Sequence, residues 1–197
     1  MALPPNSDTP RGQQLMAMVR AAKEDISQKW ENPTKDDLAL IGAVIVMYSN
    51  MELNLRRFVE ILDHENMLPE QWKGKSGKLP VGDLETIIEA MPDMSPPNIV
   101  ALQRIREGRK LRNMLAHLAT KKIPNEDGFV FVSKDERDFK NVLGGAPTPG
   151  QVMVSVADGQ QLRNIIKLLD GVQMWLAQAT KDIEDQHFKK ETARRTD

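Results

Sequence analysis

A run of basic, amide and imidazole side chains between residues 109 and 117 is the part of the sequence best suited to chemistry on a phosphodiester. The run is Arg109-Lys110-Leu111-Arg112-Asn113-Met114-Leu115-Ala116-His117. The chain has only three histidines, and His117 is the one that follows an Arg-Asn pair and a basic run. An arginine can hold two phosphate oxygens at once, and a histidine can accept and donate protons near neutral pH. These residue types therefore indicate a site that binds a phosphodiester and cleaves it.

RNA is the substrate that this set of groups fits. Cleaving RNA without a metal requires a base for the 2′-hydroxyl proton, an acid for the leaving 5′-oxygen and a fixed cation for the phosphoryl charge. We expect Arg112 to stabilise the phosphate, His117 to transfer protons, and Asn113 to position His117 or the ribose. Because each chain has one such histidine, separate acid and base roles require two copies of the chain.

The polar residues of a predicted helix over about residues 97–119 form a stripe along its accessible face. At about 100° per residue, the stripe contains Arg106, Arg109, Asn113 and His117, with Lys110 and Arg112 at its flanks. We expect the additional basic residues to bind the substrate. Arg112 and His117 lie five residues apart, which is about 140° around a helix and roughly 7.5 Å along it. Either the helix is distorted near its end, or a second copy completes the site in a dimer with its two-fold axis near the stripe.

Hydrophobic periodicity predicts the elements that must position this stripe. Helices are expected over about 11–29, 35–64, 83–91 and 97–119, and from Asp158 onward, where Asp158 is the cap. Thr34 and Asp37 have the spacing of a capping box at the start of the second helix. Two short β-branched or aromatic runs, 129–133 and 152–156, predict a two-stranded ribbon. The expected fold class is therefore all-α, an antiparallel helical bundle with a small β insertion after the motif helix.

Composition places this bundle in one domain. The chain has 197 residues, of which 40% are hydrophobic and 5% aromatic, which favours helix-on-helix packing over a sheet sandwich. We expect residues 1–10 to be a flexible arm, 11–187 the single helical domain with the ribbon near 129–156, and 188–197 a flexible charged tail. Cysteine is absent, so disulfides and thiolate metal sites are excluded. We expect no metal and no other cofactor.

Charge and hydropathy limit the partners of the chain. A net charge of −1 argues against coating nucleic acid by bulk electrostatics, so any contact with RNA must be local. The N-terminal residues lack a basic region followed by an apolar stretch, so no signal peptide is expected. The longest apolar run, 38–48, is shorter than the roughly 20 residues that a membrane-crossing helix needs. We therefore expect a cytoplasmic protein with no membrane partner.

The segment 111–117 resembles the signature of HEPN domains, in which an arginine, usually followed by a polar residue, precedes a histidine by four to six intervening positions. Here Arg112 is followed by Asn113, and four residues separate it from His117. The resemblance extends to residues 48–55, which are similar to the long helix of that group with Glu52 as its inward acid. It also includes the strands after the histidine helix, and in all it covers about residues 35–185.

The resemblance implies a helical bundle that dimerises with its Arg-His motifs facing each other. Many such proteins are metal-independent endoribonucleases in toxin, phage-defence or RNA-processing systems, and a toxin would have an antitoxin or another protein partner. By position, Arg112 and His117 would be the catalytic pair and Asn113 the polar helper. One subgroup has a tyrosine two residues after the histidine, where this chain has Ala119. Control by modification of that tyrosine is therefore not implied.

Other interpretations of the same residues stay open at this stage. The groove between two copies could bind RNA, a nucleotide or a protein without cleaving anything, or the dimer could be purely structural. The polar stripe could be an ordinary solvated helix face, in which an imidazolium near the helix C-terminus is favoured by the macrodipole. Glu52 could be a paired structural acid or could support an arginine of the site.

Overall fold

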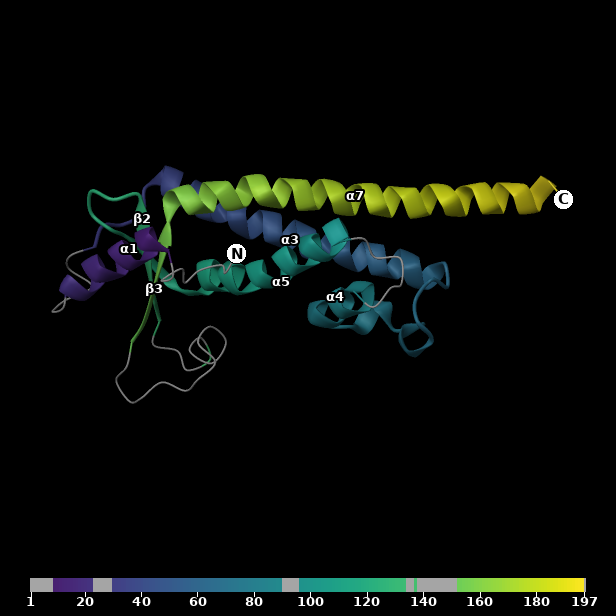
Figure 1. The fold of residues 1–197 in the computed structure, drawn as a ribbon, viewed down its shortest axis with the longest axis horizontal. Coiled ribbons are helices and arrows are strands. Elements are labelled where there is room, and N and C mark those ends of the chain that lie inside the picture. Colours follow the sequence, from purple (N-terminus) through teal and green to yellow (C-terminus); the bar gives the residue numbers. More distant parts are fainter. Residues whose placement is uncertain (1–8, 23–29, 90–95, 134–136, 138–151, 197) are drawn as a thin grey trace. The chain divides into compact units, whose positions relative to one another are not determined.

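The computed structural model describes residues 9–22, 30–89, 96–133, 137 and 152–196 (Figure 1), and 71% of these residues are helical. The prediction of a largely helical fold is confirmed. In chain order, the elements are α1 (Pro10–Ala21), α3 (Lys35–His64), the 3₁₀ turns η1 (Glu70–Trp72) and η2 (Ser76–Lys78), α4 (Val81–Glu89), α5 (Pro96–His117), β1 (Ala119–Lys122), β2 (Gly128–Ser133), β3 (Met153–Asp158) and α7 (Gly159–Thr196).

The β insertion has three strands, so the prediction of a two-stranded ribbon was wrong. The expected runs are present as β2 and β3, and β1 precedes them in an antiparallel sheet of order β1-β2-β3. Lys121 and Lys122 of β1 lie opposite Val130 and Phe129 of β2. A four-residue strand containing two lysines lacks the alternating apolar pattern that marks a half-buried strand. Because the sequence does not mark the start of this strand, the preceding helix was predicted to continue to residue 119. In the structure α5 ends at His117, two residues earlier.

The start of α3 follows the capping pattern seen in the sequence. The backbone N–H of Thr34 donates to the Asp37 carboxylate at 2.9 Å, and the Asp37 N–H donates to Thr34 Oγ1 at 3.2 Å. The two residues thus satisfy each other's backbone donors, as a capping box does. The predicted bounds of this helix, 35–64, are confirmed.

Several expectations fall partly outside the described residues. The N-terminal arm was expected over 1–10, of which residues 1–8 lie outside. The first helix was expected to reach residue 29, but α1 ends at Ala21 and residues 23–29 lie outside. Residues 90–91 of the predicted short helix lie outside as well. At the other end, the backbone of α7 continues as a helix to Thr196, through the segment for which a flexible tail was expected.

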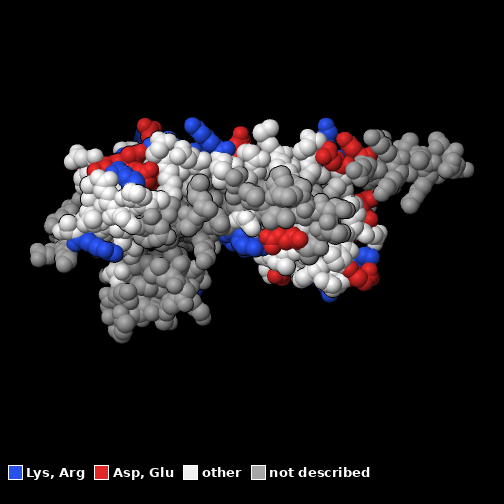
Figure 2. Space-filling view, viewed as in Figure 1, with Lys and Arg blue, Asp and Glu red and all other residues white. Residues whose placement is uncertain are grey.

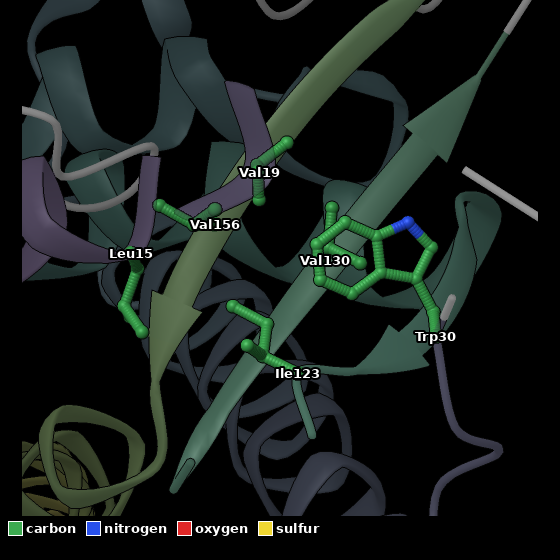
Figure 3. Close-up of a cluster of buried hydrophobic side chains, with 6 residues drawn as sticks. All are labelled: Leu15, Val19, Trp30, Ile123, Val130 and Val156. Carbon is green, nitrogen blue, oxygen red and sulfur yellow. The ribbon is translucent and has the colours of Figure 1, made fainter. Parts of the chain in front are cut away.

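The chain forms two compact units, each assembled from separate stretches. Unit 1 contains Met1–Val46 and Glu107–Lys167, and unit 2 contains Met47–Arg106 and Leu168–Asp197. In unit 1, α1 packs against β3. The buried cluster that joins them draws on α1, the sheet and neighbouring loops (Figure 3), and it consists of Leu15, Val19, Trp30, Ile123, Val130 and Val156.

The core of unit 2 is helical. Large apolar side chains of α3, α4, α5 and α7 are fully buried there, among them Met51, Leu55, Leu84, Ile87, Ile105, Leu169 and Leu176. Phe58 of α3 and Trp175 of α7 have ring centroids 6.4 Å apart at an interplanar angle of 57°, a geometry that aromatic pairs favour. Arg57 and Glu184 form an ion pair at 2.7 Å between the same two helices.

One helix meets the length and composition expected of a membrane-crossing segment. An 18-residue window of α3 has a mean hydropathy of 1.5. A single such helix is weak evidence, because the core helix of a soluble protein meets the same criterion. The expected absence of a membrane partner stays a prediction.

Candidate functional site

The last turns of α5 are held in place by their apolar side. Leu111, Met114, Leu115 and Leu118 are each at most 7% exposed. These residues thus form the buried side of the helix end within unit 1. Because buried side chains fix the rotation of a helix about its axis, the polar residues between them project from a defined surface.

Arg112 and Asn113 interact directly on that surface. Arg112 Nη1 donates to Asn113 Oδ1 at 2.9 Å, and both side chains are half-buried. Arg112 Nε is buried and donates no hydrogen bond to any residue that the structure describes. Asn113 therefore orients one end of the guanidinium.

His117 is the final residue of α5, and its side chain is exposed. Its backbone is fixed on both sides, because Leu118 N donates to Met114 O at 3.0 Å and β1 begins at Ala119. Among the described residues, no hydrogen bond or ion pair involves the imidazole. The exposed imidazole is thus available for proton transfer as far as the described residues are concerned.

Arg112 and His117 do not meet within one chain. The helix α5 is α-helical from Pro96 to His117, so the five-residue separation keeps its value of about 140° and about 7.5 Å. Moreover, Arg112 Nη1 is directed to Asn113. A regular helix to His117 therefore speaks against the alternative of a distorted helix, and the expectation of a second copy stays a prediction.

The remaining predicted site residues have different surroundings. Arg109 is half-buried in unit 1, and the side chain of Lys110 lies outside the described part. Arg106 belongs to unit 2, where its exposed Nη2 contacts Glu89 Oε2 at 2.8 Å. Because Glu89 already pairs with this guanidinium, Arg106 is less available to bind a phosphate. Glu52 also belongs to unit 2 and is half-buried on α3.

The sequence did not reveal the network that supports the strand after His117. Lys122 Nζ, on β1, lies 2.8 and 2.9 Å from the two carboxylate oxygens of Asp37, which is 7% exposed. Burial raises the pKa of Asp37, but hydrogen bonds from Lys122 and Thr34 and the charge of Lys122 lower it more, so the pKa lies below its usual value. Since 85 residues separate Lys122 from Asp37, no local pattern could have predicted this contact.

A second ion-pair network holds α1 to the sheet in unit 1. Arg11 contacts Glu126 at 2.6 Å and Asp158 at 3.2 Å. The hydrogen bond to Glu126 raises the pKa of Arg11 more than burial lowers it, and Asp158 adds to the rise. The side chain of Arg11 is 32% exposed, and those of Glu126 and Asp158 are 22% and 17% exposed. The network has a structural role, since both carboxylates are already engaged.

On the face shown in Figure 2, basic and acidic side chains of the described residues lie interspersed. In that part of the chain, no group of three or more His, Asp or Glu side chains is placed to hold a metal ion. That face thus shows no broad basic patch for nucleic acid among the described residues.

Comparisons of the chain with models of known families, with curated proteins and with solved structures returned no match.

Proposed function

We propose that the protein is a metal-independent endoribonuclease of the HEPN type, active as a homodimer in which two α5 helices form one composite site. The observation that carries the proposal is the exposed His117 ring, without a partner among the described residues, at the fixed end of the helix that also presents Arg112. Asn113, one helical turn before His117, holds the Arg112 guanidinium, so one helix end presents all three groups. A toxin or phage-defence setting is part of the proposal on the resemblance alone.

The proposed reaction uses both copies of His117. A neutral imidazole in one copy accepts the proton of the RNA 2′-hydroxyl, and the 2′-oxygen attacks the neighbouring phosphorus. The bond from phosphorus to the 5′-oxygen breaks, and a protonated His117 in the second copy donates a proton to that oxygen. Arg112 stabilises the negative charge on the phosphoryl oxygens. The products are a 2′,3′-cyclic phosphate and a 5′-hydroxyl end.

A cleavage assay with a matched histidine control tests the proposal. The purified chain is incubated with labelled RNA and excess chelator, alongside His117→Ala and His64→Ala. His64 is also the last residue of a helix and its side chain is 75% exposed, so it reports what removing an exposed histidine does in general. We expect His64→Ala to cleave like the wild type, and His117→Ala to be about 10²-fold slower or more.

Two further substrates and variants make the assay specific. Arg112→Lys keeps the charge but loses the planar fork that binds two phosphate oxygens, so it should also slow cleavage. An RNA with a single 2′-deoxy nucleotide at the cleaved position should stay intact, because it lacks the attacking oxygen. An inactive wild type, or equal losses in both histidine variants, would refute the proposal. RNA that is bound through Arg112 without being cut would instead favour the non-catalytic dimeric module.

A further inference from the structure

Unit 2 exposes two large apolar side chains beside one groove. Leu53 on α3 is 66% exposed and Met174 on α7 is 68% exposed, the highest values among the large hydrophobic residues of the described part. The groove has a volume of about 440 Å³ and is lined by Asn50, Leu53, Asn54, Asp170, Gln173, Met174 and Ala177. Two large apolar side chains exposed beside one groove are typical of an interaction site.

The exposed face of α7 that borders the groove has a regular pattern. Asp170, Met174, Ala177 and Lys181 are all exposed and follow one another at spacings of four, three and four. At about 100° per residue they fall within a strip about 60° wide. This alternation of three and four is the spacing with which one helix packs along another in a coiled coil.

The charges at the two ends of this strip are available for a partner. Asp170 and Lys181 make no ion pair or hydrogen bond with any residue that the structure describes. They have opposite signs and lie at equal distances from the midpoint between Trp175 and Leu176. An antiparallel copy of the same helix, related by a two-fold axis at that midpoint, would place Asp170 opposite Lys181 of the other chain.

The apolar centre of the strip fits the same arrangement. The two-fold axis places the large Met174 opposite the small Ala177 of the second copy, which lets the helices approach closely. A parallel arrangement in register would instead place Asp170 against Asp170 and Lys181 against Lys181, and such like-charge contacts are unfavourable. The strip is thus complementary to itself in the antiparallel orientation, as an isologous interface must be.

We propose that this face of α7, with Leu53 of α3 at its edge, is an antiparallel two-fold interface for a second copy of the chain. This interface goes beyond the composite site on α5, because it can form whether or not α5 cleaves RNA. If both surfaces are used, two different two-fold interfaces join more than two copies of the chain. Because a dimer could form through α5 alone, the test must act on the α7 contact itself.

Charge exchange on α7 tests the interface with the full chain. Sedimentation velocity over a range of protein concentrations measures association of the wild type and of variants at low salt. We expect Asp170→Lys and Lys181→Asp each to weaken association about tenfold or more, because each creates two like-charge contacts across the two-fold axis. The double variant Asp170→Lys/Lys181→Asp restores both pairs and should associate like the wild type, which a merely unfolded protein could not do.

An apolar substitution with a matched control completes the experiment. Met174→Glu should weaken association, whereas Met67→Glu, at an exposed methionine of unit 2 outside the groove, should not. A monomeric wild type, no rescue in the double variant, or an equal effect of Met67→Glu would overturn the interface. RNA cleavage by the same preparations is a separate readout: a wild type that associates through α7 but leaves RNA intact refutes only the ribonuclease proposal.

Discussion

Replacing Asp37 with alanine should destabilise the protein by much more than the loss of a surface charge would. The Asp37 carboxylate accepts from Thr34 N at 2.9 Å and from Thr34 Oγ1 at 2.7 Å, and it contacts Lys122 Nζ at 2.8 and 2.9 Å. Losing its half of the capping box costs about 1 kcal/mol. Losing a hydrogen bond between charged groups costs about 2 kcal/mol more.

The expected decrease in the free energy of unfolding is therefore about 3 kcal/mol. Asp37→Ala leaves the Lys122 ammonium without its partner. This does not add the larger penalty of an isolated buried charge, because the Lys122 side chain is 23% exposed and its ammonium can rehydrate. Asp36 is the matched control: it lies in the same first turn of α3 but is exposed. Asp36→Ala loses the same charge and should cost about 0.5 kcal/mol through the helix dipole.

Urea denaturation of Asp37→Ala, Lys122→Met and the double variant measures the part of this energy that belongs to the ion pair. Circular dichroism reports the transition, and the double-mutant cycle should yield a coupling energy of about 2 kcal/mol. Exposed ion pairs typically yield about 0.2–1 kcal/mol. A coupling energy below about 0.5 kcal/mol, or equal losses in Asp36→Ala and Asp37→Ala, would refute the argument from burial.

The difference in free energy of unfolding between the wild type and Asp37→Ala should depend on pH, and its direction follows from the pKa of Asp37. The folded-state pKa of Asp37 is lowered from its usual 3.8, so the ionised carboxylate is favoured in the folded state. The stability that it contributes is fully present above pH 3.8 and is lost as the pH falls through the lower folded pKa. The gap between wild type and Asp37→Ala should thus be constant from neutral pH down to about pH 5 and shrink below about pH 4.

Two further predictions concern close packing and a loop. Gly128→Ala should destabilise the protein by about 1–3 kcal/mol in urea denaturation. The new Cβ would lie 2.8 Å from a Cδ atom of Leu15, which is fully buried and has little room to move. An unchanged denaturation midpoint would contradict this prediction. Asp63→Asn should cost about 1 kcal/mol, because the Asp63 carboxylate accepts from Gly74 N at 2.8 Å and Ser76 N at 3.3 Å. Burial raises the pKa of Asp63, but these hydrogen bonds lower it more. The stability lost in Asp63→Asn should therefore be seen above about pH 4 and vanish as the pH falls. A loss of stability that increases in acid would contradict this prediction.

Local signals made the helices around the site predictable. The reciprocal hydrogen bonds of Thr34 and Asp37 involve residues three apart, so their sequence spacing was sufficient to place the start of α3. Asp158 was likewise expected to cap the last helix, and its Oδ2 accepts from Gln161 N at 3.0 Å. Arg112, Asn113 and His117 could be placed on one helix for the same reason, because helical geometry follows from spacing alone.

Features that depend on distant residues could not be predicted in this way. The strand β1 exists because β2 pairs with it, and its own four residues contain no apolar alternation. The role of Lys122 depends on a carboxylate 85 residues earlier in the sequence. The half-burial of Arg112 and the exposure of His117 likewise depend on packing of the whole unit. Only the identity of these residues, and not their accessibility, was visible in the sequence.

The junction between α5 and β1 connects stability to the proposed chemistry. His117 ends a helix anchored by buried leucines, and two residues later begins the strand β1, which pairs with β2 and is tethered through Lys122 to Asp37. The backbone of His117 is thus fixed while its imidazole stays exposed, the combination that precise proton transfer needs. It follows that His117→Ala and Asp37→Ala should reduce RNA cleavage in different ways. His117→Ala removes the reacting group but leaves the helix–strand junction intact, so cleavage should fall while the free energy of unfolding stays unchanged. Asp37→Ala loosens the junction, so cleavage should fall only as unit 1 loses stability.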